Sequence, residues 1–243
     1  MAAEYQALHN EKHKNVKIKS KTSVEDLKNQ HALGLVVQEF ALAGAEFPVV
    51  FVRDEKAKAT FPVAILGVEQ NTNLFVTEEN KWSGRYVPAR YTHVPLSVIP
   101  HQEDENRFAI AINVNSEVVS EDEGTALFNE DGSESEYLAE RKKALMGYVE
   151  NEKITKAFIA ALEENELLAP KNINVKVMDR EYNLNGLLMV DEKKLSELSD
   201  EAFLSLRKRG FLGPIYAHLS SMHKVADLIE RQGARLKAQE AAA

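Results

Sequence analysis

The stretch FPVVFVRDEKAKATFPVAILG, residues 47–67, decides the fold class of this chain. Two apolar, β-branched runs, Phe47–Val52 and Pro62–Gly67, flank a charged link from Arg53 to Ala59. Runs of this length and composition are typical of buried strands, and a short charged link favours strands that are neighbours in one sheet. We therefore expect two adjacent buried strands here.

Further strand patterns lie on both sides of this pair. The run Leu33–Val37 predicts a strand, and strands are also expected at Leu96–Ile99 and Phe108–Asn113. Asn15–Lys19 alternates apolar residues with lysine, which fits a short edge strand or, equally, a solvated lysine tail. The spacing favours an antiparallel meander over strands that alternate with crossover helices.

Helical patterns dominate after a polar turn at Asn129–Gly132, although a short helix is also expected between Val37 and Pro48. The composition of residues 134–168 is helical, and Gly147 and Asn151 suggest a break between two shorter helices. Alternating apolar residues then predict a β-hairpin near 172–190.

Two final helices complete the predicted fold. The first runs from about Asp191 to Arg209 with Ser199 as an internal N-cap, and the second has Pro214 in its first turn and ends near Gly233. The predicted class is α+β, with an antiparallel β-rich N-terminal half and a helical C-terminal half that contains the hairpin. We divide the chain into a polar lysine-rich segment (1–22), a β-rich region (23–133), a mainly helical region (134–233) and an alanine-rich tail (234–243), within one integrated globular domain.

Composition excludes several classes of protein. The 243 residues contain no cysteine, so thiol nucleophiles and disulfides are excluded. The glycines form neither a phosphate-binding loop nor a dinucleotide or nucleophile-elbow motif, and no cofactor is expected. The first residues are polar, not typical of a signal peptide, and no apolar run approaches the ~20 residues of a membrane span. We therefore expect a soluble, cytoplasmic protein.

The net charge of −8 is concentrated in one part of the chain. Between Glu103 and Glu136 there are eleven acidic residues and one basic residue. Binding to duplex nucleic acid requires a basic stripe, and only the lysine-rich N-terminal segment offers one. Nucleic acid is therefore not an expected partner. His9 and His13 are four residues apart but lack a third ligand, so we predict a disordered terminus and no metal site.

The segment NLFVTEENKWSGRYVPARYTHVP, residues 73–95, contains the only tryptophan together with tyrosines and arginines. Rigid aromatic rings and arginine side chains supply most of the binding energy at protein interfaces, so this segment is a candidate recognition surface for a peptide or protein. The alternative is a packed loop whose arginines pair with the chain's own acidic residues. The candidate binding residues are Trp82, Arg85, Tyr86, Arg90, Tyr91 and His218.

His218 lies on the apolar stripe of the predicted last helix. A buried histidine requires partners for its ring nitrogens, and this predicts a role in core packing. The alternative is acid or base chemistry in an open cleft, with Tyr216 or Ser220 as neighbours.

Five blocks of sequence, in order, resemble the SapC family of bacterial proteins from about Tyr5 to Leu228. They are Gln38-Glu39-Phe40 with Phe47-Pro48-Val49-Val50-Phe51, Ala64-Ile65-Leu66-Gly67 with Asn73-Leu74-Phe75, Trp82 with Arg85-Tyr86-Val87-Pro88-Ala89, Gly124-Thr125-Ala126-Leu127-Phe128 with Asp131-Gly132, and Ile215-Tyr216-Ala217-His218-Leu219-Ser220-Ser221. The resemblance implies a connection with the cell envelope or a surface layer, and it implies no established catalytic residues.

Three hypotheses for the function follow. The first is a non-enzymatic binding or accessory protein of an envelope or surface-layer system. The second is an enzyme or substrate-recognition subunit of a peptide- or protein-modification system, and the third is a self-assembling structural protein. The sequence leaves homo-oligomer formation open.

Overall fold

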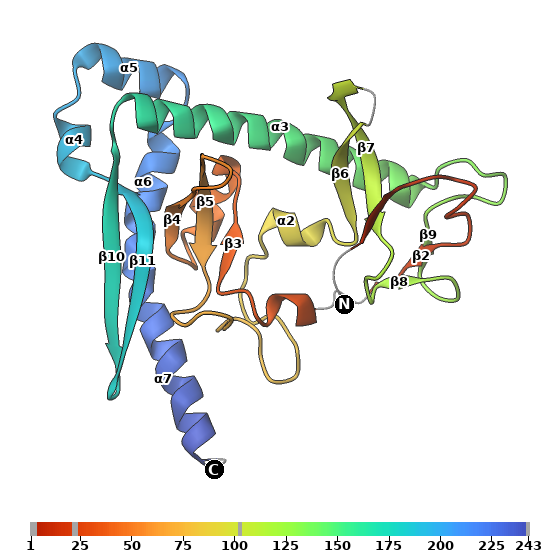
Figure 1. Cartoon of the computed structure of the whole chain (residues 1–243), viewed down its shortest axis with the longest axis horizontal. Helices are drawn as coiled ribbons and strands as arrows, with labels where there is room; N and C mark the ends of the chain where they lie inside the picture. The colour runs from red at the N-terminus through yellow and green to blue at the C-terminus, as the bar shows by residue number, and fades with distance from the viewer. Residues whose placement is uncertain (1–3, 21–23, 102–103, 242–243) are drawn as a thin grey trace. The chain divides into compact units, whose positions relative to one another are not determined.

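The computed structural model describes residues 4–20, 24–101 and 104–241, and the chain divides into two compact units (Figure 1). Unit 1 comprises residues 1–23 and 89–150, and unit 2 comprises residues 24–88 and 151–243. Each unit thus combines segments that are distant in the sequence. The predicted class is confirmed, because antiparallel sheets are followed by a helical C-terminal half with a hairpin. The division into sequence regions stays a prediction.

Unit 1 contains two small antiparallel sheets, with strand orders β1-β7-β6 and β8-β2-β9. Its core includes Ile112, Leu127 and Leu138, none of which has exposed surface. The elements are β1 (Tyr5–Ala7), β2 (Lys17–Ile18), α2 (Ala89–Thr92), β6 (Leu96–His101), β7 (Asp104–Asn113), β8 (Val119–Ser120), β9 (Thr125–Ala126) and the first part of α3 (Glu136–Glu164).

Residues 4–20 of the lysine-rich N-terminal segment are folded, which corrects two predictions. Strand β2 is the central strand of its sheet and not an edge strand, because β8 and β9 pair with its two sides. Ile18 is buried and His13 is only 3% exposed, so neither a solvated tail nor a disordered terminus describes this segment. The acidic stretch before β9 supplies partners for two of the lysines: Lys19 Nζ lies 3.1 Å from Glu123 Oε1, and Lys17 Nζ donates to the Asp122 carbonyl at 3.1 Å.

Unit 2 is built on a five-stranded antiparallel sheet of order β10-β11-β4-β5-β3. The predicted strand pair in residues 47–67 is confirmed as β4 and β5. The predicted strand at Leu33–Val37 is shorter, because Val37 already begins a 3-10 turn. The elements are η1 (Glu25–Leu27), β3 (Ala32–Gly34), η2 (Val37–Glu39), α1 (Phe40–Ala43), β4 (Val49–Asp54), β5 (Ala59–Ile65), the rest of α3, β10 (Leu168–Val177), β11 (Arg180–Val190), α4 (Glu192–Ser196), α5 (Asp200–Lys208), α6 (Leu212–Ser221), η3 (Met222–Lys224) and α7 (Val225–Ala241).

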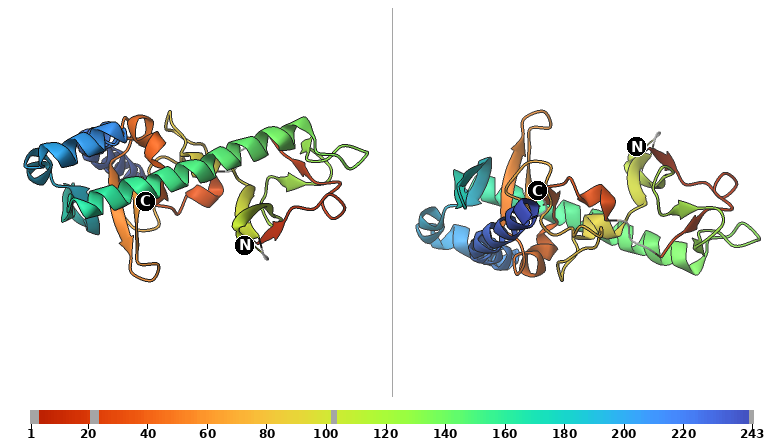
Figure 2. Two further views of the ribbon diagram at one scale, coloured as in Figure 1. Left: turned by 90° about the horizontal axis from the view of Figure 1, so that it is seen from above. Right: turned by 90° about the horizontal axis from the view of Figure 1, so that it is seen from below.

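Helix α3 is continuous over 29 residues, so the predicted break at Gly147 and Asn151 is wrong (Figure 2). A glycine in a helix interior costs only about 1 kcal/mol relative to alanine. Leu145 and Val149, one turn apart on either side of Gly147, are both buried. Their burial outweighs the local preference for a break.

The predicted last helix is two helices, α6 and α7, joined by the 3-10 turn η3. Gly233 does not end α7, which continues to Ala241. Leu236 is 3% exposed, so burial continues beyond the glycine. A Cβ atom at Gly233 would lie 3.6 Å from Val177 Cγ1, which is an ordinary van der Waals contact, so α7 packs on β10 here without requiring a glycine. No helix in the described residues is long and apolar enough to cross a membrane.

Candidate functional site

The Trp82 ring anchors the candidate loop, which we define as residues 73–88, on the core of unit 2. It stacks on Phe75 at a centroid distance of 5.8 Å and an interplanar angle of 27°, and it lies T-shaped to Phe47 at a centroid distance of 6.1 Å. Phe47 and Phe75 are 0% and 2% exposed. Trp82 Nε1 donates to the Tyr86 carbonyl at 3.0 Å, which closes the loop on itself. Trp82 is therefore largely a packing residue.

Glu46 fixes the backbone of the loop. Its carboxylate accepts the Arg85 N–H at 2.7 and 2.8 Å and the Tyr86 N–H at 3.2 Å. Gly84 permits this approach, because a Cβ atom there would lie 2.7 Å from Trp82 Nε1 and 2.8 Å from Glu46 Oε2. Charge-assisted hydrogen bonds of this kind are the stronger ones in proteins. The loop is thus held both by the aromatic contacts of Trp82 and by the hydrogen bonds of Glu46.

The phenol of Tyr86 is also engaged within unit 2. Its hydroxyl donates to Glu39 Oε1 at 2.5 Å, while Glu39 Oε2 accepts the Val36 N–H at 2.8 Å. Glu39 is 5% exposed, so this carboxylate needs such partners. Neither Glu39 nor Glu46 was predicted as a site residue, because they lie 47 and 39 residues from their partners and no local pattern links them.

Arg231 of α7 contacts the loop at Phe75 and Ser83. Its guanidinium lies 4.1 Å from the centroid of Phe75 and donates to Ser83 Oγ at 3.1 Å. A cation over an aromatic face stabilises by about 0.5–1 kcal/mol at exposed sites. No pattern in the sequence indicated this contact between α7 and the loop.

The Arg85 side chain is left available to solvent. Arg85 is exposed, and within the described residues its guanidinium has neither an ion pair nor a hydrogen bond. The same holds for Arg90. For these two arginines the described chain therefore does not provide the acidic partners that the packed-loop alternative required.

The predicted set of site residues is distributed over both units. Trp82, Arg85 and Tyr86 share the loop of unit 2, whereas Arg90 and Tyr91 belong to α2 of unit 1, where Tyr91 is 5% exposed. The structure therefore brings together three of the aromatic and basic residues from this segment.

His218 lies in the core of unit 2 and has no exposed surface. Its Nδ1–H donates to the Val49 carbonyl at 2.6 Å, and its Nε2 accepts the Val190 N–H at 3.0 Å. Strands β4 and β11 pair directly at Phe51 and Leu188, so the imidazole bridges them two residues further along the same register. Burial lowers the pKa of His218 to about 4, against a smaller opposing effect of the Val49 carbonyl. The ring is neutral and both of its nitrogens are hydrogen-bonded, so His218 has a structural role. It does not line the open cleft that acid–base chemistry would require.

Ser221 completes this arrangement. Its hydroxyl accepts the Val49 N–H at 2.9 Å and donates to the His218 carbonyl at 2.6 Å. Both backbone groups of Val49 are therefore satisfied by side chains one turn apart on α6. This accounts physically for the spacing of His218 and Ser221 in the last block of the sequence resemblance.

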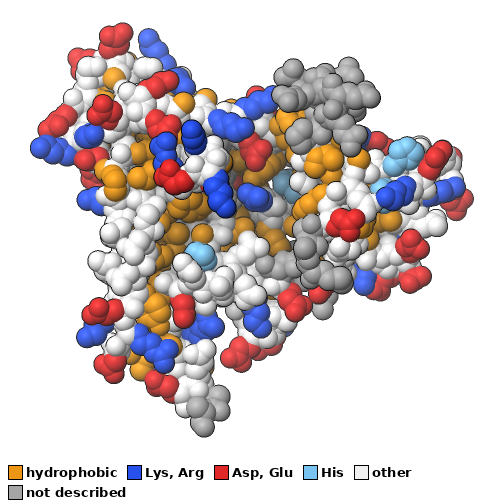
Figure 3. All heavy atoms as spheres, in the orientation of Figure 1, with side chains coloured by type: hydrophobic (Ala, Val, Ile, Leu, Met, Phe, Trp, Pro, Cys, Tyr) orange, Lys and Arg blue, Asp and Glu red, His pale blue; other side chains and the backbone are white. Residues whose placement is uncertain are grey.

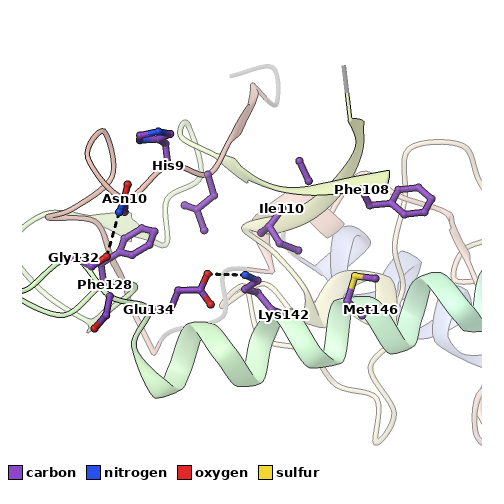
Figure 4. A pocket seen from close by; sticks show the side chains of 12 residues that line it. His9, Asn10, Phe108, Ile110, Phe128, Gly132, Glu134, Lys142 and Met146 are labelled. Atoms are coloured by element: carbon purple, nitrogen blue, oxygen red, sulfur yellow. Dashed lines mark hydrogen bonds and ion pairs between the residues drawn. The ribbon is translucent and has the colours of Figure 1, made fainter. Parts of the chain in front are cut away.

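Unit 1 contains a separate pocket of about 530 Å³ (Figure 4). Its apolar wall includes Ile110, Phe128 and Met146, and at its polar end Lys142 Nζ lies 2.7 Å from Glu134 Oε1. No sequence motif indicated this pocket. In the part of the chain that the structure describes, no three His, Asp or Glu side chains are grouped so as to hold a metal ion.

The antiparallel α+β fold is that of the class predicted from the sequence. Residues 8–228 match the model of the SapC family, and the chain therefore belongs to the SapC family. Neither the curated proteins nor the solved structures contain a match to this chain.

Proposed function

We propose that this chain is a non-enzymatic binding or accessory protein of a bacterial cell-envelope or surface-layer system, and that it recognises a peptide or protein partner. The observation that supports the proposal most is the state of Arg85: its backbone is fixed by Glu46, whereas its side chain is exposed and has no partner in the described chain. A preorganised loop loses little conformational entropy on binding, which favours recognition.

The chemistry of Arg85 defines the partner. A guanidinium presents a planar fork of donors that matches a carboxylate with two parallel hydrogen bonds. We infer that the partner carries an acidic side chain or a terminal carboxylate at the point that contacts the loop. Trp82 and Tyr86 hold the loop in place, and the positive charge that contacts the partner's carboxylate comes from Arg85.

The distribution of charge is consistent with a protein partner. On the face shown in Figure 3, basic side chains are interspersed with acidic ones and do not form a continuous stripe. Nucleic acid recognition requires such a stripe, so its absence on this face gives no support to that class of partner.

Copurification from the native bacterium tests the proposal. The tagged chain is crosslinked in cells, and the captured proteins are identified separately in the envelope and cytoplasmic fractions. Enrichment of envelope proteins is expected. A captured set limited to cytoplasmic proteins would contradict the envelope assignment.

A further inference from the structure

Strand β7 of unit 1 has one edge that the neighbouring strands cover only in part. On one side, β6 pairs with it from Ile112 to Phe108 and beyond. On the other side, β1 pairs only with residues 111–113, and one further hydrogen bond joins Leu8 N–H to the Ile110 carbonyl at 2.8 Å. Among the described residues, no strand continues the row of β1 alongside Phe108.

The register shows which backbone groups face this edge. Leu8 bonds to Ile110 from the β1 side, and alternate residues of an antiparallel strand direct both main-chain groups to the same side. Phe108 therefore directs its N–H and its carbonyl to the side on which β1 lies, beyond the last residue of β1 that pairs with β7. The partner of Phe108 on β6 is Pro100, which has no N–H to donate, as expected where the pair makes no hydrogen bonds across the ladder.

The pocket of unit 1 lies beside this edge (Figure 4). Along β7, Ile112 has no exposed surface, Ile110 is partly buried and Phe108 is 41% exposed. Met146 of α3, which also lines the pocket, is 49% exposed. The apolar side chains on this face of β7 are thus incompletely covered beyond the end of β1.

We propose that unit 1 binds an extended peptide segment by strand addition at this edge. The segment continues the row of β1, its main chain pairs with the N–H and carbonyl of Phe108, and one of its apolar side chains enters the pocket between Ile110, Phe128 and Met146. This is the arrangement by which exposed sheet edges bind peptides, with main-chain bonds for affinity and a pocket for selectivity.

Two observations select this occupant. A free N–H and carbonyl spaced along a strand are satisfied together by another main chain in extended conformation. The two charged side chains of the pocket, Glu134 and Lys142, neutralise each other at 2.7 Å, so the pocket complements an uncharged side chain. Its volume of about 530 Å³ is ample for one the size of leucine, methionine or phenylalanine. The proposal is independent of Arg85, which belongs to unit 2.

Titration of the ¹⁵N-labelled full chain with a short synthetic peptide tests the proposal. The peptide has blocked ends, leucine at every second position, and threonine and lysine between them. We expect the amides of Phe108 and Ile110 to shift, and hydrogen exchange at the Phe108 N–H to slow by tenfold or more. A matched peptide that is N-methylated at alternate residues retains the side chains but cannot form the ladder, and we expect it not to bind.

Paired variants test separately how the strand edge and the pocket contribute to peptide binding. Phe108→Pro and Phe108→Ala both lose the ring, but only the proline variant loses the N–H, so it should bind about fivefold to tenfold more weakly than the alanine variant. Met146→Glu should abolish binding, whereas Leu204→Glu, at a helical position of similar exposure in unit 2, should not. The proposal is overturned if no peptide binds, if the N-methylated peptide binds equally well, or if Met146→Glu binds as the unmodified chain does.

Discussion

Glu46 accepts the backbone N–H of Arg85 with both carboxylate oxygens, at 2.7 and 2.8 Å. This relationship links residues 39 positions apart and fixes the backbone of the candidate loop, while the Arg85 side chain stays exposed. In the proposed function, the main chain of Arg85 holds the loop in place and its side chain contacts the partner. The two roles can be tested separately.

Replacing Glu46 should loosen the loop. Glu46→Ala removes the acceptor of two backbone N–H groups, and we expect the free energy of unfolding to fall by about 1–3 kcal/mol in urea denaturation. Glu55→Ala is the control, because Glu55 is exposed and its contact with Arg53 is 4.0 Å long. Equal losses for the two variants would show that Glu46 does not brace the loop.

Replacing Gly84 should destabilise the loop. The Cβ atom of Gly84→Ala would collide with the Trp82 indole and the Glu46 carboxylate, so we expect a loss of about 1–3 kcal/mol. Because Trp82 is the only tryptophan, its fluorescence reports on the same site. Unchanged stability with an unchanged emission maximum would contradict the described packing.

Replacing Gly147 of α3, in contrast, should increase the stability of the chain. A Cβ atom at Gly147 meets nothing within 4 Å, so Gly147→Ala gains helix propensity without a clash. We predict that it raises the free energy of unfolding by about 0.5–1 kcal/mol. A loss of stability would indicate that α3 is not continuous at this residue.

The burial of His218 should make stability depend on pH. In the folded chain its pKa is lowered to about 4 from an ordinary value of 6.5. As the pH falls below 6.5 the unfolded chain binds a proton that the folded chain does not, so the contribution of His218 is complete above pH 6.5 and is lost between pH 6.5 and 4. We expect this residue to lower the stability by about 2 kcal/mol between pH 7.5 and 5.

Urea denaturation at these two pH values measures the effect, with His218→Gln as the comparison. The glutamine variant is less stable at both values, because it cannot reproduce the bridge between Val49 and Val190. It should lack the part of the pH dependence that belongs to the imidazole. An identical pH dependence in the two proteins would show that His218 titrates normally.

Local patterns predicted the elements that depend on local sequence. The strands at residues 47–67 follow from apolar, β-branched runs, the hairpin from alternation and the cap at Ser199 from capping chemistry, and the structure confirms them. The position of β2 and the continuity of α3 depend on partners elsewhere in the chain. Lys19 and Glu123, for example, are remote in sequence, and no local pattern shows that they meet.

The same distinction holds for the candidate site. Composition drew attention to residues 73–95, and the apolar stripe predicted that His218 is buried. The acceptors Glu39 and Glu46 and the brace Arg231 were missed, because each acts on a residue 39 or more positions away. Charge and aromatic content locate a surface, whereas the groups that fix its geometry require the fold.

Capture with matched arginine variants tests the central claim most directly. Arg85→Ala should fold with unchanged stability and lose the captured envelope protein, because the partner's carboxylate then has no guanidinium to contact. Arg180→Ala removes another exposed arginine of unit 2 that has no partner in the described chain, and it should retain that protein. If Arg85→Ala captures the same protein in the same amount as Arg180→Ala, Arg85 is not the recognition residue and the account is contradicted.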